Sequence, residues 1–314
     1  MNEKLAIVIP AYKSTFLRKT LKSIASQTDN GFILYIGDDC SPYDIKSIVD
    51  DFKDQIKLVY HRFEENLGGK DLVAHWERCI ALTKDEPYIW LFSDDDIMDS
   101  QCVELFHALP EKTKKNSLVH FNIRMIDDTN GGTIEQLPKF PEIMTAGEYL
   151  ENKLRGKIIS FVVEFVFSKN LYNKVGGFQN FDLAWGSDFM TWLKMAANCK
   201  NGIVTINGAN AFVNWRKSGE NISPNKTKPI LIRKINSLIE NAAFIKKQLE
   251  CFPDNYKPLN NSFRWVRFPL GEIHRNSQFL TTKEIGDLCK NYYKKVGYVH
   301  YTILVYLKTL LCHK

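Results

Sequence analysis

Three consecutive carboxylates, Asp94, Asp95 and Asp96, follow the apolar run 88–92 and are the clearest sign of chemistry in this chain. Like charges packed together at the end of a buried strand repel one another, so they are costly unless a cation or solvent compensates them. Hard carboxylate oxygens suit Mg²⁺ or Mn²⁺, which proteins commonly share with substrate phosphates. The segment therefore predicts a divalent cation site. The alternative is a solvated acidic turn before a helix that starts near Asp99.

Chemically useful groups also follow the other predicted strands. An aromatic ring and free backbone groups suit a base or ribose, and a carboxylate can accept a hydrogen bond from the imide N–H of uracil. Paired glycines permit close backbone approach, and a lysine adds charge near a helix start. These groups are Pro10, Ala11 and Tyr12, then Asp39, then Asn66, Gly68 and Lys70. Each is ordinary turn chemistry alone, but their order favours one shared site.

Alternating apolar and amphipathic segments must position these groups. Strands are predicted at 5–9, 32–36, 56–60, 88–92, 117–125, 158–167 and 202–213, and helices at 16–24, 44–52, 70–83 and 187–199. The first helix has Ser14 or Thr15 as its expected N-cap. The alternation of strands and helices between 5–9 and 88–92 is typical of βαβ units. It predicts an α/β fold with a mostly parallel central sheet flanked by helices. Ligands bind beyond the carboxyl ends of such strands, where the groups above are expected.

The motifs resemble, in order and spacing, those of the family 2 inverting glycosyltransferases with a GT-A (Rossmann-like) fold. The likeness covers roughly residues 4–223 and leaves out the C-terminal third. The matching segments are Ile7-Val8-Ile9-Pro10-Ala11-Tyr12, Asp38-Asp39-Cys40-Ser41, Asn66-Leu67-Gly68-Gly69, Trp76-Glu77-Arg78-Cys79, Ser93-Asp94-Asp95-Asp96, Gly176-Gly177-Phe178, Gly186-Ser187-Asp188, Trp192-Leu193 and Trp215-Arg216-Lys217-Ser218-Gly219-Glu220-Asn221-Ile222-Ser223.

The resemblance implies how a nucleotide-sugar donor would bind. Tyr12 would stack near the uracil of a UDP-sugar, and Asp39 would bond the N3–H of that base. The acidic segment occupies the family's DxD position, with Asp95 and Asp96 as metal ligands and Asp94 nearer the ribose. A Mn²⁺ or Mg²⁺ ion held there would bridge the diphosphate and neutralise the UDP leaving group.

The resemblance also implies a catalytic base. Asp188 matches the residue that deprotonates the acceptor hydroxyl, and its expected place at a helix start favours the carboxylate form. Many relatives have Asp, Glu and His at three positions that are here Ser93, Ser187 and Ser218. Arg216 or Lys217 is expected to face the diphosphate instead, with an ordinary surface charge as the alternative. Metal affinity is consequently expected to be modest.

Composition and charge suggest two regions. The chain has 314 residues, 44% of them hydrophobic, and its seven cysteines show no paired C-x-x-C spacing. This argues against a zinc site or a disulfide framework and suits a reducing cytoplasm. Residues 225–314 carry 16 lysines and arginines against 6 acidic residues, whereas residues 1–224 carry 26 against 30. We therefore expect a catalytic domain at 1–224 and a basic, mostly helical extension at 225–314.

The extension ends in an apolar, tyrosine-rich stretch at 296–311. Breaks are expected near Pro253, Pro258 and Pro269. The stretch falls short of the ~20 apolar residues that span a bilayer. It predicts peripheral contact of 290–311 with the inner face of the cell membrane, and a helix packed on the core or in a homodimer is the alternative. Nucleic acid is not an expected partner, because no recognised module accompanies the charge.

The sequence thus predicts an enzyme that transfers a single sugar from a UDP-sugar to a hydroxyl of a glycan or lipid-linked glycan. Two alternatives are a sugar nucleotidyltransferase and a degenerate transferase that serves as a nucleotide-binding or scaffolding module. The segment 10–14 is a poor version of the glycine-rich loop that a nucleotidyltransferase needs. Retention of Asp39, Asp95 and Asp188 together argues against the degenerate protein.

Overall fold

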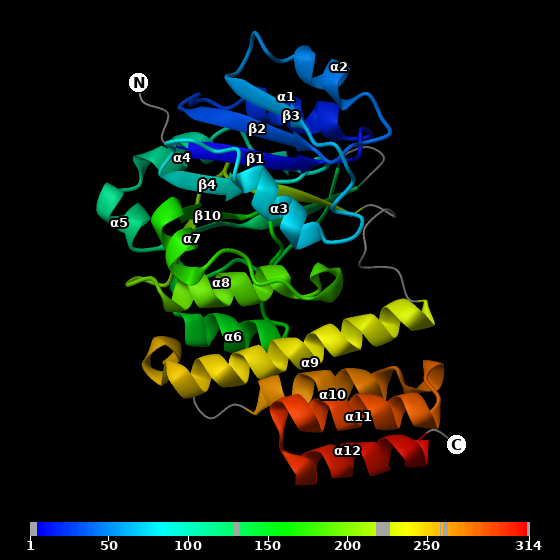
Figure 1. Ribbon diagram of the computed structural model, residues 1–314. Helices are drawn as coiled ribbons and strands as arrows, with labels where there is room; N and C mark the ends of the chain where they lie inside the picture. Colours follow the sequence, from blue (N-terminus) through cyan, green and yellow to red (C-terminus); the bar gives the residue numbers. More distant parts are fainter. Residues whose placement is uncertain (1–4, 128–131, 218–226, 258, 260–262, 313–314) are drawn as a thin grey trace.

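The computed structural model describes residues 5–127, 132–217, 227–257, 259 and 263–312. The strands of its main sheet are β1 Leu5–Ala11, β2 Phe32–Asp38, β3 Leu58–Arg62, β4 Tyr88–Leu91, β6 Leu118–Phe121, β9 Ile143–Met144, β10 Phe165–Ser168 and β11 Ile203–Ile206. They lie in the order β3-β2-β1-β4-β10-β6-β11-β9, with a stack of helices beneath the sheet (Figure 1). The predicted α/β class is confirmed.

The strands β3, β2, β1 and β4 run parallel, so their carboxyl ends share one edge. Ala11 lies opposite Asp38 in this register. Strand β1 continues through Pro10, which pairs with Gly37, so the prediction that this strand covers only 5–9 and ends before Pro10 is wrong. Proline lacks only the N–H donor, so a strand can pass through it near its end.

The helices α1 Leu17–Ala25, α2 Ile45–Asp50 and α3 Leu72–Ile80 connect these parallel strands. The N-cap of α1 is Phe16, with no side-chain hydrogen bond, so the prediction of Ser14 or Thr15 is wrong. Helix α3 begins with a side-chain cap, because Asp71 Oδ1 accepts a hydrogen bond from Ala74 N at 2.9 Å. This cap fixes where the loop after β3 becomes helical.

A second sheet lies beside the first and has the order β5-β12-β7-β8. Its strands are β5 Ile97–Met98, β7 Ile123–Asp127, β8 Thr133–Gln136 and β12 Val213–Lys217. The predicted strands 117–125 and 202–213 are therefore each divided between two sheets. The first division falls at Asn122, between β6 and β7. The Asn122 side chain donates a hydrogen bond to Asn207 Oδ1 at 3.0 Å and accepts one from Phe140 N at 3.0 Å. Because β5 directly follows Asp96, this sheet supports the acidic segment.

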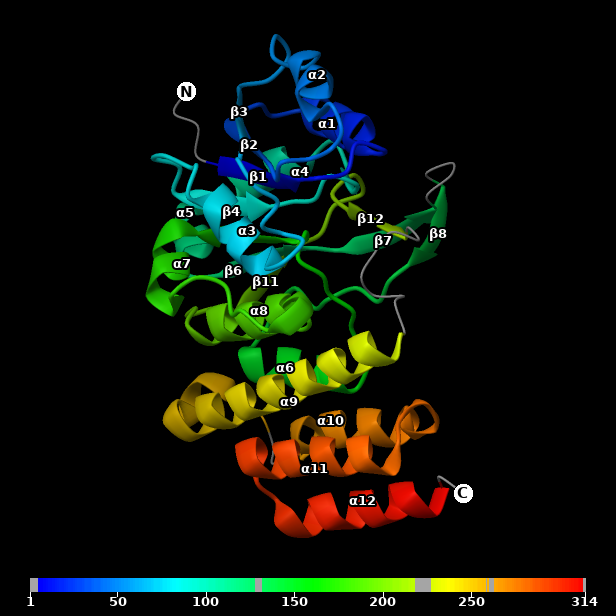
Figure 2. The ribbon, with the colours of Figure 1, turned by 45° about the vertical axis from the view of Figure 1, so that its right-hand side comes forward.

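Further α-helices before residue 200 are α4 Cys102–Ala108, α5 Glu111–Lys115, α6 Ala146–Leu154, α7 Lys169–Val175 and α8 Ser187–Ala197. Helices α6 and α8 lie between the sheet and the C-terminal helices in both views (Figures 1 and 2). The start of α8 carries Asp188, so this layer brings the predicted base to the sheet edge.

Four long helices form the C-terminal stack: α9 Lys228–Cys251, α10 Arg264–Arg275, α11 Thr282–Val296 and α12 Val299–Cys312. Helix α12 is the layer farthest from the sheet (Figure 2). The break near Pro253 is confirmed by a short 3₁₀ turn, but α10 runs through Pro269, so the break predicted there is wrong. Pro258 and the domain boundary near residue 225 lie outside the described residues, and the two-domain division stays a prediction.

One apolar core joins the C-terminal stack to the layer above it. It includes Trp192 of α8, Ile239 of α9, Ile273 of α10 and Tyr292 of α11. The basic extension therefore packs on the body through buried side chains, which is the main source of its attachment. Within the described ranges, none of the helices has the length and apolar character needed to cross a membrane.

Candidate active site

One cavity of about 760 Å³ opens at the carboxyl ends of β1 and β4 and reaches to α9 and α10. It brings together most of the residues predicted from the sequence. These are Pro10, Tyr12, Asp39, Asn66, Gly68, Asp94, Asp95, Asp96 and Asp188. The predicted binding residues that do not line the cavity are Ala11, Lys70 and Arg216, together with Lys217, the predicted alternative to Arg216. Ala11 is buried in the sheet. Lys70 is exposed, and its Nζ lies 3.6 Å from Glu65 Oε2.

The first carboxylate of the acidic segment fastens the end of β1 to the end of β4. Asp94 Oδ2 accepts hydrogen bonds from the backbone N–H groups of Tyr12 at 2.8 Å and Lys13 at 2.7 Å. Burial, together with the charge of Asp95, raises the pKa of Asp94 to about 6, although the two N–H groups act in the opposite direction. Asp94 therefore shapes the loop that carries the Tyr12 ring.

The other two carboxylates differ in what they contact. Asp95 reaches the cavity, with Oδ2 3.3 Å from Lys13 Nζ. Asp96 instead accepts a hydrogen bond from Ser93 Oγ at 2.6 Å and one from the backbone N–H of Arg216 at 2.6 Å. Burial and the charge of Asp95 raise the pKa of Asp96 well above its ordinary value. Asp96 thus holds the segment to β12 and lines the cavity together with Asp95.

This donor set fits a divalent cation only in part. Within the described ranges, no group of three or more His, Cys, Asp and Glu side chains is arranged to hold a metal ion. Mg²⁺ and similar ions commonly bind one or two carboxylates and take their other ligands from substrate phosphates and water. Asp95 suits that arrangement, and each oxygen of Asp96 accepts one hydrogen bond from the protein and keeps a second lone pair.

Arg216 lies behind the acidic segment. Its side chain is 0% exposed, with Nε donating to Asp95 O at 2.8 Å and Nη1 to Asp127 O at 3.0 Å. The guanidinium also lies 4.2 Å from the centre of the Phe16 ring. Arg216 therefore positions the backbone of the carboxylates and does not face the cavity. Ser218, the other predicted departure in this loop, lies outside the described residues.

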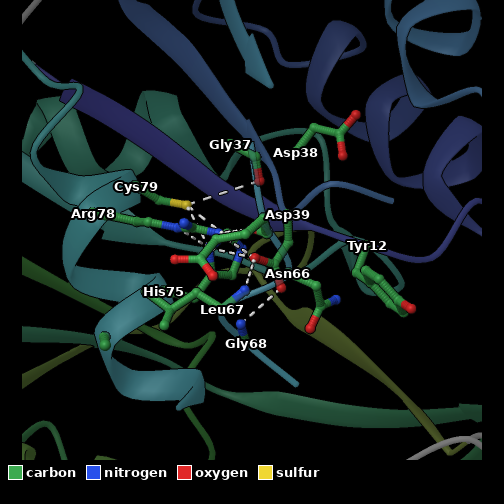
Figure 3. A network of polar contacts seen from close by, with 12 residues as sticks. Tyr12, Gly37, Asp38, Asp39, Asn66, Leu67, Gly68, His75, Arg78 and Cys79 are labelled. Carbon is green, nitrogen blue, oxygen red and sulfur yellow. Dashed lines mark hydrogen bonds and ion pairs between the residues drawn. The ribbon is translucent and has the colours of Figure 1, made fainter. Parts of the chain in front are cut away.

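Asp39 is the centre of a hydrogen-bonded network at the end of β2 (Figure 3). Its Oδ1 accepts from Leu67 N at 2.9 Å and from Arg78 Nη2, and its Oδ2 accepts from Gly68 N at 2.8 Å. A Cβ at Gly68 would lie 2.6 Å from Asp39 Oδ2, so only glycine allows this approach. The network joins the loops after β2 and β3 into one wall of the cavity.

His75 and Arg78 are members of this network that the sequence did not assign. Arg78 Nε donates to His75 Nδ1 at 3.0 Å, and that nitrogen lies 3.4 Å from Asp39 Oδ1. Burial lowers the pKa of His75 to about 4, so the imidazole is neutral. The sequence does contain one sign that His75 and Arg78 act together. They are three positions apart on α3, and positions three apart share a helix face.

The loop before α8 holds Asp188 in a constrained backbone. Leu183 and Ala184 line the cavity in the left-handed region, with φ of 60° and 53°. Gly186 has a φ of 84°, and a Cβ there would lie 2.0 Å from Asn241 Nδ2, so glycine is required. Non-glycine residues in this conformation are uncommon and concentrate at functional sites.

Burial raises the pKa of Asp188, although a helix start alone would lower it. The Lys153 charge opposes that rise. Lys153 lines the cavity at the end of α6 and donates to Ser160 O at 2.8 Å and Ser160 Oγ at 2.9 Å. The Asp188 carboxyl group thus lies in a partly apolar site where the charge of Lys153 acts on it, which is an environment suited to a base.

Glu164 completes this charged group. Its Oε1 accepts from Phe161 N at 2.6 Å, and its charge interacts with those of Lys153 and Asp188. The segment that carries it is fixed by two indoles, since Trp90 Nε1 donates to Val163 O at 2.6 Å and Trp192 Nε1 to Phe161 O at 2.9 Å. Sequence reasoning assigned no role to Lys153 or Glu164. The sequence sign that could have identified Glu164 is that it is the lone glutamate inside the apolar run 158–167.

Comparisons with solved structures show proteins of similar fold. The structure of Staphylococcus aureus TarS 1–349 in complex with UDP-GlcNAc has a TM-score of 0.61 at 15% identity, covering 98% of this chain and 89% of that one. The mannosyltransferase PcManGT from Pyrobaculum calidifontis, in complex with GDP-Man and Mn²⁺, has a TM-score of 0.52 at 13% identity, covering 100% and 89%. Likeness at such identities concerns the fold. Among curated proteins, none matches this sequence.

The family comparison covers the part of the chain that carries the strand ends. The model of the family described as Glycosyl transferase family 2 matches residues 6–169, slightly more than half of the chain. This match sets aside the nucleotidyltransferase alternative. The chain belongs to glycosyl transferase family 2, and it is a glycosyltransferase of the GT-A fold.

Proposed function

We propose that this glycosyltransferase moves a single sugar from a UDP-sugar to a hydroxyl group of a glycan or lipid-linked glycan, with inversion at the anomeric carbon. The observation that carries the proposal is that Asp95 and Asp188 line the same cavity. One carboxylate comes from the end of β4 and the other from the start of α8, so a sugar diphosphate can lie between them. The TarS structures with UDP-GlcNAc and with UDP support a UDP-linked donor.

In this proposal Asp188 is the general base. A carboxylate oxygen of Asp188 accepts the proton of the acceptor hydroxyl. At the same time the hydroxyl oxygen of the acceptor bonds to the anomeric carbon, and the bond between that carbon and UDP breaks. Attack from the side opposite the leaving group inverts the configuration. Burial raises the pKa of Asp188, and the neighbouring Lys153 charge opposes that rise. General bases of this kind typically contribute 10²–10⁴-fold to the rate.

The strand ends would hold the nucleotide. Tyr12 is 40% exposed at the cavity edge, where its ring can stack on a base. Asp39 is held by backbone N–H groups with its carboxylate at the cavity wall, where a remaining lone pair can accept the N3–H of uracil. Asp95 would hold a Mn²⁺ or Mg²⁺ ion together with the diphosphate, and that ion would supply charge neutralisation for the leaving group. The Mn²⁺ in the PcManGT structure supports this assignment.

The last helix supports peripheral membrane association through 290–311, at the inner face of the cell membrane. One face of α12 exposes large aliphatic side chains, namely Ile303, Leu304, Leu307 and Leu311. Lysines precede this helix, and basic residues beside an apolar face favour anionic bilayers. Deleting 290–314 should move the protein from liposomes of anionic lipid to the soluble fraction. Unchanged flotation would contradict the membrane contact and favour packing of α12 in a homodimer.

The donor assignment is tested by a thermal-shift panel of UDP-sugars and GDP-mannose, each with and without Mn²⁺. A ligand that binds the native state stabilises it by an amount that grows with concentration over Kd. We expect a UDP-sugar with Mn²⁺ to raise Tm the most. Stabilisation by GDP-mannose alone would overturn the uridine assignment.

A further inference from the structure

The cavity continues past Asp188 into a region that the nucleotide sugar does not explain. Its far end is walled by two helices outside the family match, α9 and α10. The apolar lining there consists of Leu238, Ala242, Ile245, Trp265, Phe268 and Pro269. Among the described residues of α9 and α10 that line the cavity, none is charged. A mostly apolar wall joined to a polar reaction site is typical of a site for an amphipathic ligand.

One polar group interrupts this wall close to the base. Asn241 is 5% exposed and lines the cavity, and its Nδ2 donates to Trp185 O at 3.2 Å in the loop before Asp188. That bond fixes the orientation of the amide. Asn241 Oδ1 is buried with no hydrogen-bond partner among the described residues. A buried unsatisfied acceptor is rare in folded proteins and calls for a partner, such as a ligand hydroxyl.

We propose that the α9–α10 end of the cavity is the acceptor subsite, and that it selects acceptors whose sugar carries an aliphatic chain. Asn241 Oδ1 accepts a hydrogen bond from a hydroxyl of the acceptor sugar, which places that sugar beside Asp188. The apolar wall then holds the first part of the chain. This inference rests on the proposed function, because it takes Asp188 as the place where the acceptor hydroxyl reacts.

The position of α10 explains why the chain would be aliphatic. Phe268 lines the cavity and is 37% exposed, so this end meets the surface at α10. Trp265 lines the same end, and its ring lies 6.0 Å from that of Tyr298, just before α12. The Arg267 guanidinium also lies over the ring of Tyr301 in α12, 5.2 Å from the ring centre. Residues at this end of the cavity therefore contact the segment that leads into α12, whose exposed face carries Ile303 and Leu304. A chain anchored in a bilayer can reach the cavity along this path.

Calorimetry on the full chain, saturated with UDP, tests the subsite with two probes. These are n-octyl β-D-glucoside, kept below its critical micelle concentration, and methyl β-D-glucoside. We expect the octyl compound to bind at least tenfold more tightly, because only it can occupy the apolar wall. Phe268→Ser should remove most of that difference while leaving the affinity for methyl glucoside unchanged. Asn241→Ala should weaken both probes, since both present sugar hydroxyls.

Phe263→Ser is the matched control. Phe263 is 57% exposed, also contacts Tyr298, and does not line the cavity. It should leave the affinities for both probes unchanged. Equal binding of the two probes by the wild type, or equal losses in Phe263→Ser and Phe268→Ser, would overturn the inference. The affinity for UDP, measured in the same samples, separates the two hypotheses, because a wild type that binds no UDP refutes the proposed function whatever the glucosides do.

Discussion

The backbone nitrogen of Tyr12 lies 2.8 Å from Asp94 Oδ2, so the first carboxylate after β4 holds the aromatic loop after β1. This single contact joins two segments that are 82 residues apart in the chain. It explains why Asp94 matters even though, in our proposal, the cation is held by Asp95.

Replacing Asp94 by alanine should therefore loosen the Tyr12 loop. Two backbone N–H groups would lose their acceptor, at roughly 1 kcal/mol or more each. We expect UDP affinity to fall about tenfold, measured by calorimetry. Asp85→Ala, at an exposed position before β4, is the control and should leave UDP affinity unchanged. Unchanged UDP affinity in Asp94→Ala would show that the loop is held by other contacts.

Replacing Asp95 by alanine should uncouple UDP binding from the metal. In the wild type we expect Mn²⁺ to increase UDP affinity at least tenfold, because cation and diphosphate bind together. In Asp95→Ala that increase should fall below about twofold. Titrating UDP with and without Mn²⁺ measures both numbers. If the wild type binds UDP equally well in either buffer, the metal assignment fails.

Asp188→Asn should abolish transfer while leaving donor binding almost intact. Asparagine keeps the shape of the side chain but cannot accept the acceptor proton as a carboxylate does. The rate should fall by about 10²–10⁴-fold, and UDP affinity should stay within about twofold. Single-turnover transfer with radiolabelled donor gives the rate. Turnover near the wild-type level would identify another residue as the base.

Lys153→Met should move the acidic limb of the pH–rate profile to higher pH. Burial raises the pKa of Asp188 and the Lys153 charge lowers it, so removing that charge raises it further. The base is active only when ionised, and activity is lost as the pH falls through the pKa. We expect at least a tenfold rate loss at pH 6 and a smaller loss at pH 8.5. Equal losses at both pH values would indicate a purely structural role for Lys153.

Glu164→Gln should change how stability depends on pH. Burial raises the pKa of Glu164 to about 8, from an ordinary value of 4.5. Between these values the folded state binds more protons than the unfolded state, so wild-type stability falls as the pH rises through this window. Lys153 and Asp188 both act on the Glu164 carboxyl group. The charge of Lys153 lowers the pKa of Glu164, and that of Asp188 raises it.

Because glutamine carries no titrating carboxyl group, Glu164→Gln should lack this contribution. From pH 5 to pH 8, wild-type Tm should fall by about 3 °C more than that of the variant. Calorimetry at the two pH values gives this difference. Glu148→Gln, at an exposed capping position of α6, is the control for a general charge effect. Parallel changes in wild type and Glu164→Gln would refute the buried titration.

The local pattern of the chain was enough to predict the first half of the sheet. Runs such as 5–9 and 88–92 are buried on both faces and alternate with amphipathic helices, so period and order determine a parallel βαβ arrangement. Because parallel strands end at one edge, the placement of Tyr12, Asp39 and Asp95 around one cavity also followed. Strand ends were less accurate, as Pro10 shows, since pairing with β2 carries β1 beyond the proline.

What only the tertiary structure decided is which polar groups face the cavity and which support it from behind. Arg216 looks like a ligand in the sequence, yet its contacts with the acidic segment and β7 bury it behind the cavity. Lys153, Glu164 and Asn241 gave no motif, because their partners lie on other elements and meet only when the helices pack. The sequence determined the strand ends through short-range periodicity. The orientation of each side chain depended on contacts between residues far apart in the chain, which no local pattern records.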